Sequence, residues 1–276
     1  MDDLAVGEQS AGEKPHGGTT LARTGFHAIE EELRRLSLEK AGREGACVYY
    51  SKALPRVKRI IEQAHRAGIK VVHTSDESLD ALVVSLPEGV RDHRGVVLLQ
   101  EGGISQAQQA VDLEQWLASC PATSCVVVLD EITDPHNVGA ILRSCDQFAV
   151  DLVVASKRRA ADVQDSETVA RSSAGASSWV KCAQVANLVN ALKQLKAAGF
   201  WVWAADAKGQ PLAKTEFAPR TCLVLGSEGR GIGRLLQSQC DLQVAVETAG
   251  HIDSLNVSVA AGILLHEIFI QHTAKR

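Results

Sequence analysis

Hydrophobic and polar residues alternate along the first third of this chain in a way that predicts helices and strands in turn. Helical spacing of apolar residues covers residues 26–36 and 55–68, and the segment 76–86 has the pattern of a short further helix. Three strands are predicted between and after these helices: residues 46–51, 70–75 and 94–100. The alternation predicts a small α/β sandwich.

The second part begins with a continuous apolar run at residues 126–132, typical of a strand that is buried on both faces. A glycine ends the clearest helix, at residues 187–199. Five further strands are predicted: residues 151–156, 179–185, 200–206, 222–227 and 242–246. We therefore expect an open parallel sheet, in which ligands bind beyond the carboxyl ends of the strands.

The last third holds two segments with the composition of a ligand site. In residues 221–233, an apolar run leads into a loop with four glycines, which can present backbone N–H groups to a ligand. A dinucleotide loop is an alternative, but the spacing does not fit the Rossmann fingerprint. After a short strand, Ser254 is expected to cap a final helix, and Asn256 to lie in its first turn.

Length and composition limit the classes of protein to which this chain can belong. The 276 residues suffice for two domains, and 45% hydrophobic with 22% charged residues is typical of a folded soluble protein. No stretch approaches the ~20 apolar residues of a membrane helix. The first twenty residues are acidic and glycine-rich, unlike a signal or transit peptide, so we expect a disordered tail and a cytoplasmic protein.

The seven cysteines include no C-x-x-C pair, which favours reduced thiols over disulfides or zinc. A nucleophile elbow, a Walker loop and the His-Glu-x-x-His pattern are absent from the sequence, so hydrolase and metalloenzyme readings have little support and no metal is expected. His136 and His251 lie beside the candidate site, but a lone histidine in a polar turn is more often structural.

Charge is unevenly distributed along the chain. The net charge is −4, yet residues 34–70 carry ten Lys or Arg against three Glu, a local charge of +7. Such asymmetry is typical of a face that binds a polyanion such as RNA, although an ordinary solvated helix surface gives the same pattern.

Three segments, taken together, resemble the motifs of the SpoU, or TrmH-like, RNA 2′-O-ribose methyltransferases. They are Asn137-x-Gly139-x-x-x-Arg143, the sequence LGSEG at residues 225–229, and SLNVSVAAG at residues 254–262. The resemblance covers about residues 126–268, and RSSAGA at residues 171–176 is similar to a segment between the first two motifs. The preceding α/β unit resembles the L30e-like domain of family members that act on ribosomal RNA.

The resemblance implies a fold that composition cannot predict: an α/β protein whose C-terminal parallel-sheet (SPOUT) domain has a deep trefoil knot, with a small N-terminal L30e-like α/β domain. It also implies a homodimer with the active site at the subunit interface. The expected organisation is a disordered tail (1–21), the L30e-like RNA substrate-binding domain (22–101), a linker (102–121) and the SpoU methyltransferase domain (122–276).

Catalytic roles follow from the resemblance, residue by residue. Arg143 matches an arginine thought to stabilise the developing 2′-oxyanion, a safer role than base because arginine stays protonated. Asn137 would hold the ribose or order the arginine. Glu228 would orient the substrate or Arg143. Ser254 and Asn256 would place hydrogen bonds around the reacting centre.

The implied cofactor is S-adenosylmethionine, bound largely through backbone groups by Leu225, Gly226, Gly229, Val246 and Leu255. The family usually has Ile-Pro-Met where this chain has Val-Glu-Thr at residues 246–248, which adds a carboxylate near the adenine pocket. It also usually has Phe-Gly where this chain has Phe-Ala at residues 148–149.

The implied activity is methyl transfer to a ribose 2′-hydroxyl, most naturally of a guanosine in 23S ribosomal RNA. Arg56, Lys58 and Arg59 are expected to bind phosphates without reading the base sequence. A transfer-RNA substrate and a non-catalytic RNA-binding or ribosome-assembly protein of the same fold are the alternatives. An oxidoreductase built on the glycine loop is a more distant one.

Overall fold

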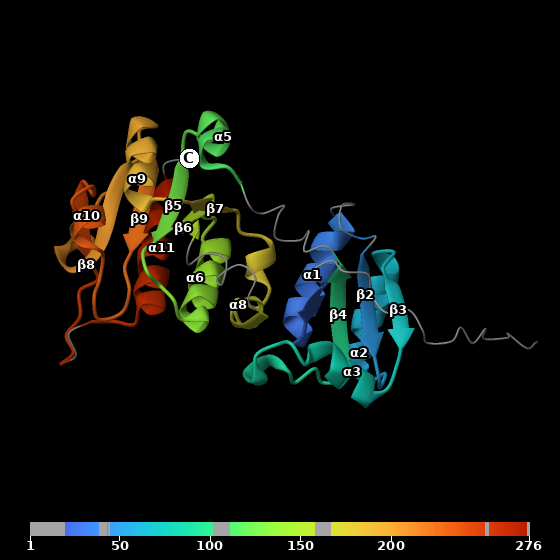
Figure 1. Ribbon diagram of the computed structural model, residues 1–276. Helices are drawn as coiled ribbons and strands as arrows, with labels where there is room; N and C mark the ends of the chain where they lie inside the picture. The colour runs from blue at the N-terminus through green and yellow to red at the C-terminus, as the bar shows by residue number, and fades with distance from the viewer. Residues whose placement is uncertain are drawn as a thin grey trace, which may run out of the picture.

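The computed structural model describes residues 20–38, 43, 45–101, 111–157, 167–251 and 254–274. Within these ranges the chain forms two α/β units that lie side by side (Figure 1). The expected tail, residues 1–21, lies outside the described residues up to residue 19, and Thr20 already belongs to the first strand.

The N-terminal unit is a four-stranded sheet in the order β1-β4-β2-β3, in which β4 is antiparallel to β1 and β2, and β3 is parallel to β2. Its strands are β1 (Thr20–Arg23), β2 (Ala46–Tyr50), β3 (Lys70–His73) and β4 (Val96–Glu101). Its helices are α1 (Phe26–Leu38), α2 (Pro55–Arg66), α3 (Asp76–Val83) and the 3₁₀ turn η1 (Glu88–Val90).

Two apolar clusters cover the two faces of this sheet. Side chains of α1 and α2 pack against Val48 and Leu98 on one face, and those of α3 pack against Val97 on the other. The arrangement agrees with the α/β sandwich predicted from the sequence. The edge strand β1 was not predicted, because four residues that follow a polar segment carry too little pattern.

The C-terminal unit is a fully parallel six-stranded sheet in the order β10-β8-β9-β5-β6-β7. All six predicted strands are present: β5 (Ser124–Leu129), β6 (Leu152–Ser156), β7 (Cys182–Val185), β8 (Trp201–Pro211), β9 (Arg220–Leu225) and β10 (Leu242–Ala245). Strand β8 extends beyond the predicted end at residue 206, through polar residues that give no strand pattern. The expected parallel α/β sheet is thus confirmed.

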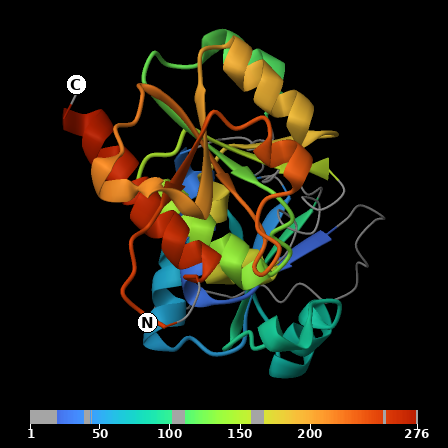
Figure 2. The ribbon, with the colours of Figure 1, turned by 90° about the vertical axis from the view of Figure 1, so that its left-hand side faces the viewer.

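Helices cover both faces of this sheet (Figure 2). One face carries α6 (Pro135–Gln147), α8 (Glu167–Ser172) and α11 (Val257–Ala274). The other carries α5 (Leu113–Ser119), α9 (Leu188–Ala197) and α10 (Arg234–Gln237). The short 3₁₀ turns are η2 (Ala176–Ser178) and η3 (Leu212–Lys214).

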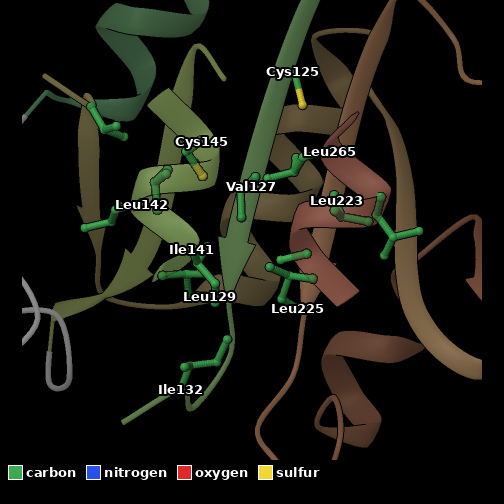
Figure 3. Packing of buried hydrophobic residues seen from close by; sticks show 14 of the residues in the cluster. Cys125, Val127, Leu129, Ile132, Ile141, Leu142, Cys145, Leu223, Leu225 and Leu265 are labelled. Carbon is green, nitrogen blue, oxygen red and sulfur yellow. The ribbon is translucent and has the colours of Figure 1, made fainter. Parts of the chain in front are cut away.

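Strand β5 lies at the centre of the core. Cys125, Val127 and Leu129 point toward α6 and α11, where they meet residues of those helices and of β9 (Figure 3). Val126 and Val128 point to the opposite face, toward α5 and α9. Both sets are almost completely buried, which confirms a strand covered on two sides.

The segment expected to be a linker, residues 102–121, is partly helical. Residues 102–110 lie outside the described residues, but α5 packs Leu113 and Trp116 against the C-terminal sheet. This helix therefore belongs to the C-terminal unit, because its apolar side chains are part of that core.

Helix α11 is apolar on its inner and outer sides. Contrary to the expectation from the sequence, it is long and apolar enough, by length and composition alone, to cross a membrane, with a mean hydropathy of 1.2, a test that a core helix also meets. Its inner residues Leu264, Leu265 and Ile268 pack in the core of the sheet. Val259 and Ile270 on its outer side are 51% and 47% exposed, so this helix has an apolar surface that the single chain does not cover.

All seven cysteines lie in the described residues and are reduced, as predicted, and four of them are buried. Burial raises the pKa of Cys145 and of Cys222 well above the ordinary value for a thiol. These thiols therefore act as small apolar core residues.

Candidate active site

Three polar side chains meet at the carboxyl edge of the C-terminal sheet. Asn137 lies in the first turn of α6, after β5; Glu228 lies in the loop after β9; and Asn256 precedes α11. Strands β5 and β9 are parallel neighbours, so the segments that follow them leave the sheet at the same edge.

Hydrogen bonds join these three side chains into one cluster. Asn137 Nδ2 donates to Glu228 Oε1 at 3.0 Å, while Asn256 Nδ2 donates to the same oxygen at 2.6 Å and to Asn137 Oδ1 at 2.9 Å. Asn137 is only 7% exposed, whereas Glu228 and Asn256 are exposed. Asn137 thus lies in the protein interior while Glu228 and Asn256 face solvent, as expected for a group of residues that contacts a substrate.

Helix α6 begins where it does because Asp134 caps it and Pro135 fills its first turn. The Asp134 carboxylate accepts a hydrogen bond from the backbone N–H of His136. Gly139, two residues after Asn137, lets α8 approach closely, since a Cβ there would overlap Ser172. The motif Asn137-x-Gly139 therefore combines a site residue with a helix contact.

The expected cap of the last helix is wrong. Helix α11 begins at Val257, and its cap is Asn256, whose Oδ1 accepts from the Ser258 backbone N–H at 2.9 Å and from Ser258 Oγ at 2.6 Å. Ser254 is exposed and precedes the helix. Asn and Ser are equally good caps, so the sequence pattern could not separate two candidates two residues apart.

The glycine loop folds back on itself immediately after β9. Ser227 and Gly231 exchange backbone hydrogen bonds of 3.1 and 2.9 Å. A Cβ on Gly226 would overlap the backbone of Gly231, so only glycine fits this reversal. Gly229 and Gly231 have positive φ, while Leu225 before the loop is buried.

Asp130 supports this loop and was not singled out by the sequence. Its Oδ2 accepts from the backbone N–H of Gly233 at 2.8 Å, which ties the end of the loop to the segment after β5. An acidic residue directly after a buried strand is the signal that could have indicated it.

The residues expected around the cofactor lie at the ends of two strands and one helix. Val246 follows β10 and Gly226 follows β9; β8 runs between them, so the strand spacing separates the two by about 10 Å. Leu255 is 36% exposed and is brought toward the loop by the bond between Asn256 and Glu228.

Glu247, the unexpected carboxylate near the candidate pocket, is engaged elsewhere. Its Oε2 accepts from the backbone N–H of Ala213, in η3, at 3.4 Å. The departure from the family pattern at this position thus adds a contact between loops.

Arg143 does not join the cluster within one chain. It lies six residues after Asn137 on α6, which turns its side chain by about 240° around the helix axis. Its side chain is exposed and lines a separate cleft next to Glu31 and Arg34 of the N-terminal unit.

The three residues expected to contact RNA phosphates differ in their surroundings. Lys58 and Arg59 are exposed on α2. Arg56 is half-buried: its guanidinium contacts His27 at 3.1 Å and Glu30 at 3.4 Å, and lies over the Phe26 ring. Arg56 therefore also holds α2 against α1.

A further cleft, of about 450 Å³, opens at the same edge of the sheet, on the side of α9 and α10. Asp130 and Gly233 line it, together with apolar residues such as Leu188 and Leu235. The residues of the cluster do not line this cleft.

The known proteins that this chain resembles are named as RNA methyltransferases. Residues 124–266 match the model of the SpoU rRNA Methylase family. An uncharacterized tRNA/rRNA methyltransferase of Borreliella burgdorferi is 38% identical over 79% of this chain and 95% of its own length. The 23S rRNA (guanosine-2′-O-)-methyltransferase RlmB of Ralstonia nicotianae is 33% identical over 90% of this chain and 95% of its own length.

Solved structures agree at the level of the fold. The SpoU methyltransferase AviRb of Streptomyces viridochromogenes, in complex with AdoMet, has a TM-score of 0.69 at 22% identity, over 93% of this chain and 92% of its own. The A. aeolicus TrmH/SpoU tRNA modifying enzyme has a TM-score of 0.50 at 25% identity, over 62% of this chain and 86% of its own. The chain therefore belongs to the SpoU rRNA methylase family and is an RNA methyltransferase.

Proposed function

We propose that this protein transfers a methyl group from S-adenosylmethionine to the ribose 2′-hydroxyl of a guanosine in 23S ribosomal RNA. The observation that carries the proposal is the hydrogen-bonded cluster of Asn137, Glu228 and Asn256 beside the Gly226 loop. The relative named as a 23S ribosomal RNA enzyme matches 90% of the chain, whereas the tRNA modifying structure covers 62%. This difference supports a ribosomal over a transfer RNA substrate.

One structural observation supports the fit of these residues to S-adenosylmethionine. Leu255 exposes an apolar side chain, Gly229 and Gly231 expose the backbone of the loop after β9, and Val246 is half-buried at the end of β10. Apolar side chains with nearby backbone donors suit an adenine ring. The cofactor supplies the methyl group, and Leu225, Gly226, Gly229, Val246 and Leu255 would hold it.

The cluster and Arg143 have different tasks in this proposal. Loss of the 2′-hydroxyl proton leaves negative charge on the ribose oxygen, and the Arg143 guanidinium stabilises that charge. Asn137, Asn256 and Ser254 hold the ribose through hydrogen bonds, and Glu228 fixes the two amides in place.

The geometry of α6 favours a homodimer in which Arg143 serves the partner's cluster. Asn137 and Arg143 point in different directions, so one chain does not bring them to the same atom. The uncovered apolar residues of α11, with Val259 and Ile270, offer a surface for a second copy. A trefoil knot formed by the C-terminal segment belongs to the same proposal.

In this proposal the protein acts in the cytoplasm, and its N-terminal unit is an L30e-like RNA-binding domain. The sheet of this unit, with helices on both faces, supports an RNA-binding domain, as do the exposed cations Lys58 and Arg59 on α2. Such cations bind phosphates irrespective of sequence, which leaves the choice of nucleotide to RNA shape.

The test is subunit complementation. Arg143→Ala is expected to lower methyl transfer to unmodified 23S ribosomal RNA at least about a hundredfold, as for loss of an oxyanion-stabilising donor, while calorimetry shows unchanged S-adenosylmethionine binding. Glu228→Ala is expected to be inactive as well. After the two variants are mixed, unfolded and refolded together, mixed dimers regain activity, because one of their two sites is intact.

Each alternative predicts a different outcome. Absence of activity in the mixture, with both variants dimeric, would place Arg143 at its own chain's site. Label in transfer RNA alone would favour the tRNA enzyme. RNA binding without any methyl transfer would favour the non-catalytic alternative.

A further inference from the structure

A polar cleft of about 400 Å³ lies where the two units meet, and both of them line it. Helix α1 contributes Glu31 and Arg34, α6 contributes Arg143 and Asp146, and the segment around η2 contributes Trp179. Figure 1 shows α1 facing α8 and the chain that follows it at this junction.

The two walls of the cleft are fixed to each other by buried contacts. Thr24 donates its backbone N–H to Glu167 Oε1 at 2.6 Å, and Ser178 Oγ donates to Glu32 Oε2 at the same distance. Gly175, with φ of +90°, lies so close to α1 that a Cβ there would meet Glu31 Cβ at 2.5 Å. The cleft is therefore a built feature of the fold.

Trp179 and Arg34 form one side of the cleft. Trp179 Nε1 donates to Glu31 Oε2 at 3.1 Å, which orients the half-buried indole. The Arg34 guanidinium carbon lies 5.8 Å from the centre of the Trp179 ring, and Arg34 Nη1 is 3.7 Å from the same Glu31 oxygen. Glu31 thus positions both an aromatic ring and a cation.

This combination fits an unpaired nucleotide. Single-stranded RNA is bound by aromatic rings and guanidinium planes that stack on bases, and by cations that contact the adjoining phosphates. Arg34 is 69% exposed along its side chain, so its guanidinium can reach a phosphate. Helix α2, with the exposed Lys58 and Arg59, packs against α1, the helix that carries Glu31 and Arg34.

We propose that the cleft between the two units binds one unpaired nucleotide of the RNA substrate, with its base on Trp179 and its phosphate on Arg34. This inference rests on the proposed function. It assigns to Trp179 and Arg34 a substrate-positioning role, and it makes the junction of the two units part of the RNA-binding surface.

The experiment measures KM and kcat for unmodified 23S ribosomal RNA in three tryptophan variants. Trp179→Leu is expected to raise KM about tenfold with little change in kcat, the loss expected when a base loses its aromatic partner. Trp179→Phe keeps a stacking surface but not the N–H to Glu31, so it should stay close to the wild type. Trp201→Leu, at a 53% exposed tryptophan on β8, is the matched control and should leave KM unchanged.

The outcomes separate this inference from the proposed function. Equal defects in Trp179→Leu and Trp179→Phe would show that Trp179 acts only by bonding Glu31, and wild-type KM in both would remove the cleft from the RNA path. Either result leaves the methyltransferase intact. Absence of methyl transfer by the wild type would instead overturn the proposed function, and direct RNA binding by the same variants would then decide on the cleft.

Discussion

Asn256 links the start of a helix to the chemistry of the site. Its Oδ1 caps α11 through Ser258, while its Nδ2 donates to both Glu228 and Asn137. The orientation of one amide therefore depends on a backbone group on one side and on a carboxylate on the other. A side chain held from both directions is already in place before a substrate binds, which reduces the cost of ordering it.

Asn256→Asp tests this arrangement. The new carboxylate still caps α11 but can no longer donate, and it sits within hydrogen-bond reach of Glu228, whose oxygen is now 2.6 Å from Nδ2. We expect kcat for RNA methylation to fall about a hundredfold and the unfolding free energy to fall by about 1–3 kcal/mol, because two carboxylates then face each other and Asn137 Oδ1 loses its donor.

Adding Glu228→Gln to Asn256→Asp is the control. The amide of the new glutamine donates to the new carboxylate, so donor and acceptor exchange places and part of the activity should return. Normal kcat in the single variant would show that the cluster lies outside the catalytic centre.

The sequence predicted the members of the cluster but not the position of Arg143. Asn137 and Glu228 follow the neighbouring strands β5 and β9, so strand order brings these two together. Asn256 follows β10, which lies beyond β8, so only its hydrogen bond to Glu228 shows that it joins them. Arg143 depends on the direction in which a helix side chain points and on what lies beside α6. Residue spacing predicts the direction of the Arg143 side chain, but only the packing of the N-terminal unit determines what lies beside it.

At the scale of elements, the hydrophobic pattern predicted the strands because most of them are buried in a regular way. Strand β5 is buried throughout and was readily predicted, whereas β1 and the end of β8 carry polar residues and were missed. Burial also explains α5: Trp116 belongs to the core, but a helix of seven residues shows too few periods for prediction.

Gly175 sets the distance between α1 and η2. Its φ of +90° already favours glycine, and an added Cβ would meet Glu31 Cβ at 2.5 Å. Gly175→Ala is therefore expected to lose about 1–2 kcal/mol of unfolding free energy from backbone strain and about 1–3 kcal/mol more from overpacking. Urea unfolding measures the total.

Gly68→Ala separates these two terms. Gly68, with φ of +72°, has no atom within 4 Å of its added Cβ, so this variant suffers the strain without the overlap. A loss in Gly175→Ala that does not exceed the loss in Gly68→Ala would mean that α1 and η2 can move apart without cost.

At the scale of the whole molecule, a buried set of charged groups joins the two units. Arg23, Glu32 and Arg35 come from the N-terminal unit, and Glu167 from α8; all four are at most 3% exposed. Thr24 and Glu167, which share a hydrogen bond, are 143 residues apart in the sequence. No local pattern predicts such a pairing, so the two units were predictable from the sequence but the contact between them was not.

The pKa values of the two carboxylates of this set shift in opposite directions. Burial alone would raise the pKa of Glu32, but the Arg23 charge and hydrogen bonds from Arg35 and Ser178 lower it to about 2. Burial raises the pKa of Glu167 to about 7, and Arg23 and Thr24 offset this only in part. Glu32 thus stays ionised at neutral pH, while Glu167 changes charge there.

This difference predicts how stability depends on pH. Because the pKa of Glu167 is raised from 4.5 to about 7 on folding, its contribution is full below pH 4.5 and is lost as pH rises through 7, by at most about 3 kcal/mol. The Glu32 contribution is instead lost only as pH falls below 4.5 toward 2.

Glu167→Gln is the test, because its amide stays neutral and still accepts from the Thr24 backbone N–H, now at 2.6 Å. We expect the variant to have a higher Tm than the wild type at pH 8 and a similar Tm near pH 4.5, measured by calorimetry across that range. Glu62→Gln, at an exposed glutamate of α2, is the matched control and should leave the pH profile unchanged. A Tm difference between Glu167→Gln and the wild type that is constant with pH would contradict this prediction. It would mean that Glu167 remains ionised in the folded protein and that Arg23 balances the charge of its carboxylate.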